Sequence, residues 1–181
     1  MNGRVEGAAA SLKTVGSPPP AKISASGTTV KAPPRRTTTK ATRTRSRAST
    51  QTKVRGFIWP VAGAWAITSS FGVRGAEGDD FHHGMDIGCA EGQPVRAAYP
   101  GRVEFTGDAG AYGNTVLLDH GSTWQTLYGH FSEFRVAPGD WANQGDVIGL
   151  CGSTGRSTGP HLHFEIRYDG YVWDPAQYLP R

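Results

Sequence analysis

The chain has 181 residues, with 19 Lys and Arg against 15 Asp and Glu, 25 glycines, 12 prolines and two cysteines. This length fits one ordinary domain and excludes a large multidomain enzyme. No stretch approaches the roughly 18 consecutive apolar residues of a membrane-spanning helix. Two cysteines exclude a disulfide-dense scaffold and a four-thiolate zinc site, so any metal must be held mainly by histidines and carboxylates.

Residues 1–55 differ in composition from the rest of the chain. They hold twelve basic residues and one acidic residue, Glu6, which gives a net charge of +11, together with 16 Ser and Thr and no Phe, Trp or Tyr. Such a segment cannot bury enough apolar surface to fold alone. We therefore predict a disordered basic tail over 1–55 and a folded, net acidic domain over 56–181.

The basic tail has three open interpretations. A solvated linker is favoured, and the others are an arm attracted to anionic wall polymers, lipid or nucleic acid, and a cleaved organelle-targeting segment. Because no aromatic residues are interleaved with the charges, the stacking platform for single-stranded nucleic acid is missing and no specific nucleic-acid partner is expected. No secretory signal is visible either, since the first 30 residues contain no apolar core.

From residue 57 onward the hydrophobic pattern has the period of two that is typical of half-buried β-strands. Val103 and Phe105 alternate with polar residues, and so do the apolar residues of 162–168. Glycine-rich and proline-rich turn signals separate these runs, among them Asp169-Gly170, a favoured two-residue hairpin turn. We predict a mainly β fold, in which a compact antiparallel sheet or sandwich-like arrangement forms the domain.

All six histidines lie between residues 82 and 163. Residues two apart in a strand point to the same face, so His161 and His163 should project side by side. His82 and Asp86 share a face in an extended chain, whereas His83 points to the other side. Two imidazoles and a carboxylate leave a fourth tetrahedral position for water, which is typical of a catalytic zinc site.

Several motifs occur in order along the chain: SFGVR at 70–74, HHGMDIG at 82–88, GQPV at 92–95, YGH at 128–130, GDVIG at 145–149 and GSTGRSTGPHLHFE at 152–165. With them, the stretch from about Trp59 to Leu179 resembles the lysostaphin/LytM-type zinc endopeptidases, which cut peptide bonds in bacterial peptidoglycan. The motifs are far more specific together than singly.

The resemblance implies that His82, Asp86 and His163 bind one Zn²⁺ and that His130 and His161 are the catalytic pair. It implies hydrolysis of peptidoglycan stem or bridge peptides by attack of a metal-bound water, in the cell envelope or outside the cell. Imidazoles that titrate near neutral pH suit the proton transfer and oxyanion stabilisation that this reaction needs. A non-catalytic regulator that binds peptidoglycan or an amidase is the alternative.

Other residues near these motifs leave two interpretations open. Arg74 either grips a substrate carboxylate or carbonyl or forms a structural ion pair. Glu165 shares a strand face with the His-Leu-His pair, so it either orients one histidine or is a surface carboxylate paired with Arg167, which is favoured. His83 and His120 are expected to be ordinary polar residues, with His120 solvated in a turn.

Two further features stand beside the metal motifs. The acidic, glycine-rich segment 75–80 precedes His82 and forms either a wall of the groove or a flexible loop. Cys89 and Cys151 pair in an oxidising envelope or remain two buried thiols.

Overall fold

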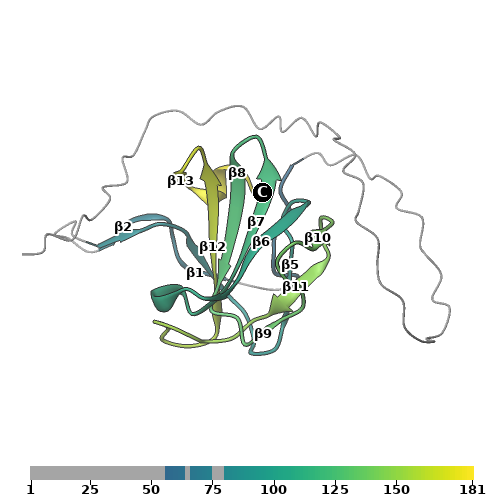
Figure 1. Ribbon diagram of the computed structural model, residues 1–181. Coiled ribbons are helices and arrows are strands. Elements are labelled where there is room, and N and C mark those ends of the chain that lie inside the picture. The colour runs from purple at the N-terminus through teal and green to yellow at the C-terminus, as the bar shows by residue number, and fades with distance from the viewer. Residues whose placement is uncertain (1–55, 64–65, 75–79) are drawn as a thin grey trace, which may run out of the picture.

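The computed structural model describes residues 56–63, 66–74 and 80–181, and within these ranges the chain is mainly antiparallel β-structure, as predicted (Figure 1). The expected disordered tail over 1–55 lies outside the described residues, as does all of the acidic segment except Asp80. Within the described part of the chain, no helix has the length and apolar character needed to cross a membrane.

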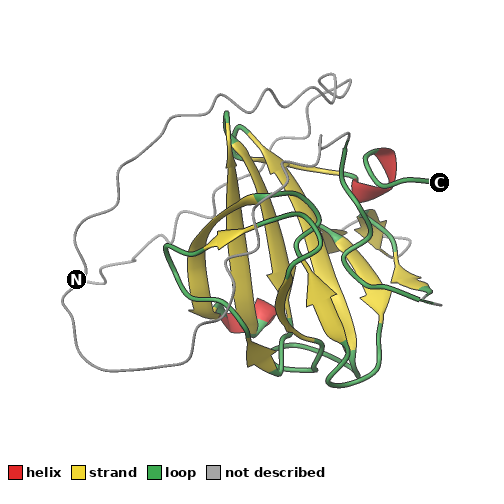
Figure 2. Ribbon diagram, turned by 90° about the vertical axis from the view of Figure 1, so that its right-hand side faces the viewer, coloured by secondary structure: helices red, strands yellow, loops and turns green. Residues whose placement is uncertain are grey.

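The largest sheet is antiparallel and has eight strands among the described residues. Seven of them lie side by side in the order β1-β4-β12-β8-β7-β6-β10, and β13 pairs with β12. Figure 2 shows this sheet as a twisted layer. The bounds of its strands are β1 Ile67–Ser69, β4 Met85–Gly88, β6 Gly101–Asp108, β7 Asn114–Gly121, β8 Trp124–Gly129, β10 Trp141–Ala142, β12 His161–Tyr168 and β13 Tyr171–Trp173.

Two smaller sheets complete the β-structure. One has the order β5-β11-β9, and the other is a two-stranded ribbon of β2 and β3. In Figure 1 the β2 strand and the three-stranded sheet lie on opposite sides of the main sheet. The bounds are β2 Gly72–Arg74, β3 Asp80–His82, β5 Pro94–Arg96, β9 Glu133–Phe134 and β11 Val147–Leu150, with short 3₁₀ turns at Gly110–Tyr112 and Pro175–Gln177.

The predicted hairpin between β12 and β13 is confirmed. Tyr168 pairs with Tyr171, and the two residues between them are Asp169 with φ 50° and Gly170 with φ 78°. Two positive φ values in succession are those of a type I′ turn, which Asp-Gly favours because Gly has no Cβ and Asp tolerates this region.

The period-two pattern predicts the side-chain face correctly for Val103 and wrongly for Phe105. Val103 is 1% exposed, but Phe105 is 40% exposed. Val103 pairs with Leu118 and Phe105 with Leu117, so β6 has one more residue than β7 at this point. This β-bulge turns the following side chains to the other face, and therefore Phe105 leaves the core.

Strand β12 also departs from the prediction of a half-buried strand. Both of its faces are covered, because the side chains of His163 and Glu165 are buried as well as those of Leu162 and Phe164. The five residues from Leu162 to Ile166 are therefore buried, and the polar side chains among them need partners there.

The segment before β1 belongs to the core. Phe57 is 6% exposed, and its ring lies 6.1 Å from that of Trp124 and 6.0 Å from that of Tyr178, centroid to centroid. Trp59 Nε1 donates a hydrogen bond of 2.9 Å to the carbonyl of Pro180. The first large apolar side chains after residue 56 thus pack against the end of the chain.

Cys89 and Cys151 form a disulfide, which decides between the two open interpretations. Cys89 follows β4 and Cys151 follows β11, and they are 62 residues apart in sequence. A cross-link over this separation stabilises a fold by about 4 kcal/mol on the chain-entropy model. The next residue, Gly152, accepts a backbone hydrogen bond from His161, so the disulfide braces a segment beside the histidine motif.

His120 is not the solvated turn residue that we expected. It lies near the end of β7 and is partly buried, with Nδ1 2.9 Å from the carbonyl of Pro100 and Nε2 2.8 Å from Thr126 Oγ1. Thr126 Oγ1 in turn lies 3.0 Å from the Tyr128 hydroxyl. Burial lowers the pKa of His120 to about 4, because the charged imidazolium is poorly solvated there.

This shift predicts a stability that depends on His120 in acid. The His120 imidazole takes up a proton near pH 6.5 in the unfolded chain but only near pH 4 in the native state. The free energy of unfolding therefore has its full value above about pH 6.5 and falls as the pH is lowered toward 4. The full effect is at most about 3 kcal/mol. Urea unfolding at about pH 7.5 and about pH 4 should show a smaller fall for His120→Gln than for the wild type. Metal contributions cancel in this difference, and an equal fall in both proteins would contradict the prediction.

Candidate metal centre and catalytic site

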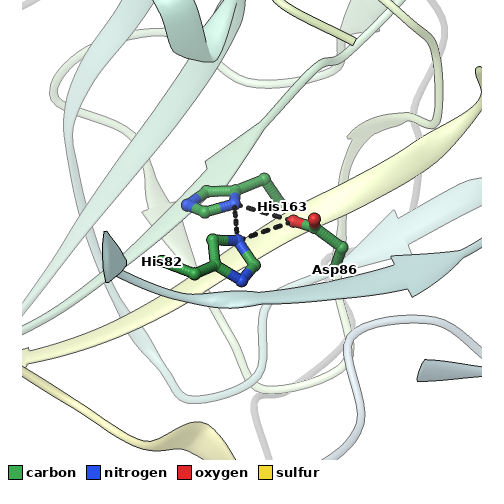
Figure 3. A group of neighbouring side chains, drawn as sticks. All are labelled: His82, Asp86 and His163. Atoms are coloured by element: carbon green, nitrogen blue, oxygen red, sulfur yellow. Dashed lines mark hydrogen bonds and ion pairs between the residues drawn. The ribbon is translucent and has the colours of Figure 1, made fainter. Parts of the chain in front are cut away.

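His82, Asp86 and His163 point toward one another and form a compact group of metal-ligand atoms (Figure 3). Asp86 Oδ1 lies 3.0 Å from His82 Nε2 and 2.9 Å from His163 Nδ1, and the two nitrogens are 3.1 Å apart. All three residues are buried. The three residues that the sequence motifs single out as ligands are therefore brought together by the fold.

Strand pairing, rather than one extended strand, brings this group together. Asp86 on β4 is the direct pairing partner of His163 on β12. His82 ends β3, and His83 and Gly84 separate it from β4, so His82 and Asp86 meet across a break between strands rather than along one extended segment. A Cβ on Gly84 would lie 2.5 Å from the carbonyl oxygen of Phe164, so only glycine permits this close approach.

The YGH motif has three different roles. Tyr128 is fully buried in the core, with its hydroxyl 2.8 Å from the amide of Ala98. Gly129 pairs with His163, and a Cβ there would lie 3.4 Å from that of the histidine. His130 follows with φ 66°, a left-handed conformation that is uncommon for a residue with a side chain. The turn at the end of β8 thus delivers His130 beside the metal-ligand group.

The outer nitrogens of the two histidine ligands fix where their protons lie. His82 Nδ1 is 2.8 Å from the carbonyl of Ser70, and His163 Nε2 is 3.0 Å from Glu165 Oε1. A carbonyl and an ionised carboxylate only accept, so both outer nitrogens carry hydrogens. The inner nitrogens, His82 Nε2 and His163 Nδ1, face Asp86 Oδ1 and present lone pairs once any proton on them is displaced by a metal ion.

This donor set fits a divalent metal ion. Two deprotonated nitrogens and a carboxylate oxygen about 3 Å apart repel one another unless a proton or a metal ion lies between them. A tetrahedral zinc site with bonds of about 2.0–2.1 Å separates its donor atoms by roughly 3.3 Å, which is close to the observed 2.9–3.1 Å. Nitrogen and carboxylate donors are those that zinc and similar metals take.

Glu165 is not the surface carboxylate that was favoured from the sequence. Its side chain is fully buried, and its two oxygens contact His163 Nε2 at 3.0 Å and Arg167 Nε at 2.6 Å. Burial disfavours its charge, but hydrogen bonds from His163 and the charge of Arg167 hold its pKa below the ordinary value. The two interpretations therefore coexist, because one oxygen orients the histidine and the other pairs with the arginine.

The neighbouring charges also shift the pKa values of Asp86 and His163. Burial opposes ionisation of Asp86, yet hydrogen bonds and positive charge from His163 and His82 hold its pKa well below the usual range. Burial likewise opposes protonation of His163, but the two carboxylates that it contacts raise its pKa above the ordinary value. Burial and the charge of Glu165 raise the pKa of Tyr112, whose ring lies 5.2 Å from that of His163, to about 12.

His130 and His161 lie next to each other at the edge of the metal-ligand group. Their ring centroids are 4.6 Å apart, and His161 Nε2 is 3.8 Å from Asp86 Oδ1, farther than either ligand nitrogen. His130 Nδ1 is bound to the carbonyl of Thr154 at 2.7 Å, and His161 Nδ1 to that of Gly159 at 2.8 Å. Burial lowers the pKa of His130, and the nearby histidines lower it further.

The two remaining candidate residues, Arg74 and His83, have different neighbours. Arg74 forms an ion pair with Asp86 Oδ2 at 2.8 Å, and the ring of His83 lies 5.6 Å from that of Phe81, outside the metal-ligand group. The sequence motifs gave no sign of the backbone carbonyls that hold His82 and His130, because any residue supplies a carbonyl.

Two histidines and a carboxylate that could hold a metal ion thus lie beside two further histidines on an antiparallel sheet. The chain belongs to Peptidase family M23, a metallopeptidase family, whose profile matches residues 80–175. This membership confirms the resemblance to the lysostaphin/LytM-type enzymes.

Named relatives share this part of the chain. DD-carboxypeptidase/endopeptidase Mpg of Neisseria meningitidis is 48% identical over 95 residues, which are 52% of this chain and 22% of that protein. The lipoprotein NlpD/LppB homolog of Pseudomonas aeruginosa is 39% identical over 125 residues, which are 67% of this chain and 42% of that protein. The chain thus spans less than half the length of these relatives.

A solved structure has the same fold. The zinc containing peptidase from Vibrio cholerae superposes with a TM-score of 0.64 and 34% identity, covering 70% of this chain and 41% of the other.

The donor set predicts one zinc ion per chain, which His163→Ala should release. Loss of a direct ligand should lower zinc affinity by more than the about 10- to 100-fold typical of residues behind the ligands. Metal analysis after dialysis checks this, with His83→Ala as the matched control that keeps its zinc. Affinity should also fall in acid from near neutral pH, since protons compete for the histidines. Full zinc content in His163→Ala would refute this ligand assignment.

Proposed function

We propose that this chain is a zinc-dependent endopeptidase that hydrolyses peptide cross-links of bacterial peptidoglycan. The observation that carries the proposal is the pair His130 and His161, which lies beside the metal-ligand group with each ring held through its Nδ1. A site that only held a structural metal would need no such pair, whereas hydrolysis needs groups that accept and donate protons. Membership of the M23 family supports the same activity.

In this proposal His82, Asp86 and His163 hold the zinc ion. When bound, zinc polarises the scissile carbonyl and lowers the pKa of the attacking water toward neutrality. His130 is neutral at neutral pH because its pKa is lowered, and its Nδ1 proton is committed to the Thr154 carbonyl. Its Nε2 lone pair therefore accepts the proton of the attacking water.

His161 supplies the second function of the pair. Its Nδ1 is held by the Gly159 carbonyl, and Ser157 Oγ lies 3.3 Å from the same nitrogen, so the ring is fixed with Nε2 toward the site. A protonated Nε2 donates a hydrogen bond to the oxygen of the tetrahedral intermediate, where negative charge develops. The proton taken up by the pair is finally passed to the leaving amine.

The substrate that we propose is a D-Ala-containing stem-peptide cross-link rather than a pentaglycine bridge. The support is the name of the Neisseria relative, a DD-carboxypeptidase/endopeptidase. We place the protein in the cell envelope, because the Pseudomonas relative is named as a lipoprotein. The disulfide between Cys89 and Cys151 agrees with an oxidising compartment.

Digestion of chemically defined muropeptides, followed by mass spectrometry, tests the activity and the bond. We expect cleavage of D-Ala cross-linked dimers in the presence of zinc. Cleavage of pentaglycine bridges alone would leave a peptidase but overturn the proposed bond. A zinc-loaded protein that cleaves neither substrate would instead support the regulatory alternative.

Replacement of either member of the histidine pair should abolish turnover while zinc remains bound. His130→Asn suits this test, because Asn tolerates the positive φ at this position, and His161→Asn is the parallel change. General acid-base groups contribute about 10²–10⁴-fold and an oxyanion donor about 10²–10³-fold, so each variant should lose at least about 100-fold in kcat. Metal content is measured on the same samples, and loss of zinc from His161→Asn would make that residue a ligand.

We also propose that residues 56–181 are a complete folding unit, since Phe57 and Trp59 pack against the end of the chain. A protein of residues 56–181 should cleave soluble muropeptides within about twofold of the full chain.

On intact anionic walls, the +11 segment 1–55 should add salt-sensitive binding, because exposed charges act within about 8 Å at physiological ionic strength. Co-sedimentation with walls over a salt series measures this, and a shortened protein that fails to fold would refute the boundary.

A further inference from the structure

The two oxygens of Asp86 have separate partners. Oδ1 faces the inner nitrogens of His82 and His163 at 3.0 and 2.9 Å. Oδ2 faces away from them and accepts a hydrogen bond of 2.8 Å from Arg74 Nη2. The carboxylate is therefore held in one rotational position, with one oxygen directed to the metal-ligand group and the other taken by the guanidinium.

The fold places this arginine beside the ligands by a short route. Arg74 lies on β2, whose partner strand β3 ends with His82. The same two-stranded ribbon thus carries His82 and the guanidinium of Arg74, which contacts Asp86. Arg74 Nε is buried and has no hydrogen-bond partner among the described residues, and the arginine side chain as a whole is 38% exposed.

We propose that Arg74 is a positioning residue that keeps Asp86 a one-oxygen ligand, an inference that rests on the proposed zinc-dependent function. A carboxylate binds a metal through one oxygen or through both. With Oδ2 held in a charge-assisted hydrogen bond, only Oδ1 remains for the metal, and the position that a second oxygen would fill stays open for the reaction. This role differs from the substrate grip that the sequence left open for Arg74.

The energetics of burial support this role. Asp86 is largely buried, and a buried carboxylate without a fixed counter-charge is costly. Arg74 supplies that charge from the side opposite the histidines, so the carboxylate keeps its orientation before any metal binds. Residues behind the metal ligands that act in this way typically contribute about 10- to 100-fold to metal affinity.

The test compares Arg74→Met and Arg74→Lys with the wild type in two measurements that need no substrate. The first is the zinc dissociation constant, obtained by competition with a chelator. The second is the visible absorption spectrum of the protein loaded with Co²⁺, whose intensity falls when coordination rises above four. Met retains the packing of the arginine stem but donates no hydrogen bond, whereas Lys keeps the charge without the planar fork.

We expect Arg74→Met to bind zinc about 10- to 100-fold more weakly and to give a weaker Co²⁺ spectrum, with Arg74→Lys between it and the wild type. Arg102→Met is the matched control, because Arg102 is exposed and donates to the Gly139 carbonyl, remote from the ligands. Should Arg74→Met fail to fold, Arg74→Lys compared with Arg102→Lys carries the same test.

Three outcomes separate the hypotheses. A wild type that binds neither zinc nor Co²⁺ overturns the proposed function itself. Zinc binding by the wild type with unchanged affinity and spectrum in the Arg74 variants overturns the positioning role alone. Where metal affinity and spectrum are unchanged, a raised KM of the Arg74 variants in the muropeptide digestion would assign Arg74 to substrate binding instead.

Discussion

The pairing of β4 with β12 is the interaction on which the site depends. Its register places Asp86 directly opposite His163, and the pairing of β12 with β8 places Gly129 on the other side of that histidine. A slip of one residue would turn the side chains of one strand to the opposite face and separate the carboxylate from the imidazole. The register is fixed because Leu162 and Phe164, which alternate with the histidines, fill the core.

The histidines of the site share a second constraint, because each is tethered through one ring nitrogen. The acceptors are the carbonyls of Ser70, Thr154 and Gly159 and the carboxylate of Glu165. An acceptor of this kind fixes the orientation of the ring and places a hydrogen on the tethered nitrogen, so the other nitrogen is directed to the site. Three backbone carbonyls and one buried carboxylate thus set the orientation of the four histidine rings.

The charges of the site follow a repeated pattern. Asp86 and Glu165 each direct one oxygen to a histidine and the other to an arginine, Arg74 in one case and Arg167 in the other. Although burial opposes ionisation, hydrogen bonds from the histidines hold the pKa of both carboxyl groups below the ordinary value, and the charge of Arg167 adds to this for Glu165, so both groups act as hydrogen-bond acceptors.

Sequence alone determined the β class, the Asp169-Gly170 hairpin and the histidine and aspartate motifs, because side-chain alternation, turn conformation and motif spacing are local properties of the chain. Only the tertiary structure decided that Phe105 leaves the core, that Glu165 is buried, and that Arg74 binds Asp86. A β-bulge depends on how a strand pairs with its neighbour. The burial of a side chain and its ion pairs depend on residues that are far away in the sequence and close only in the folded chain. Hydrophobic periodicity says which face a residue occupies, but contacts between strands decide what that face meets.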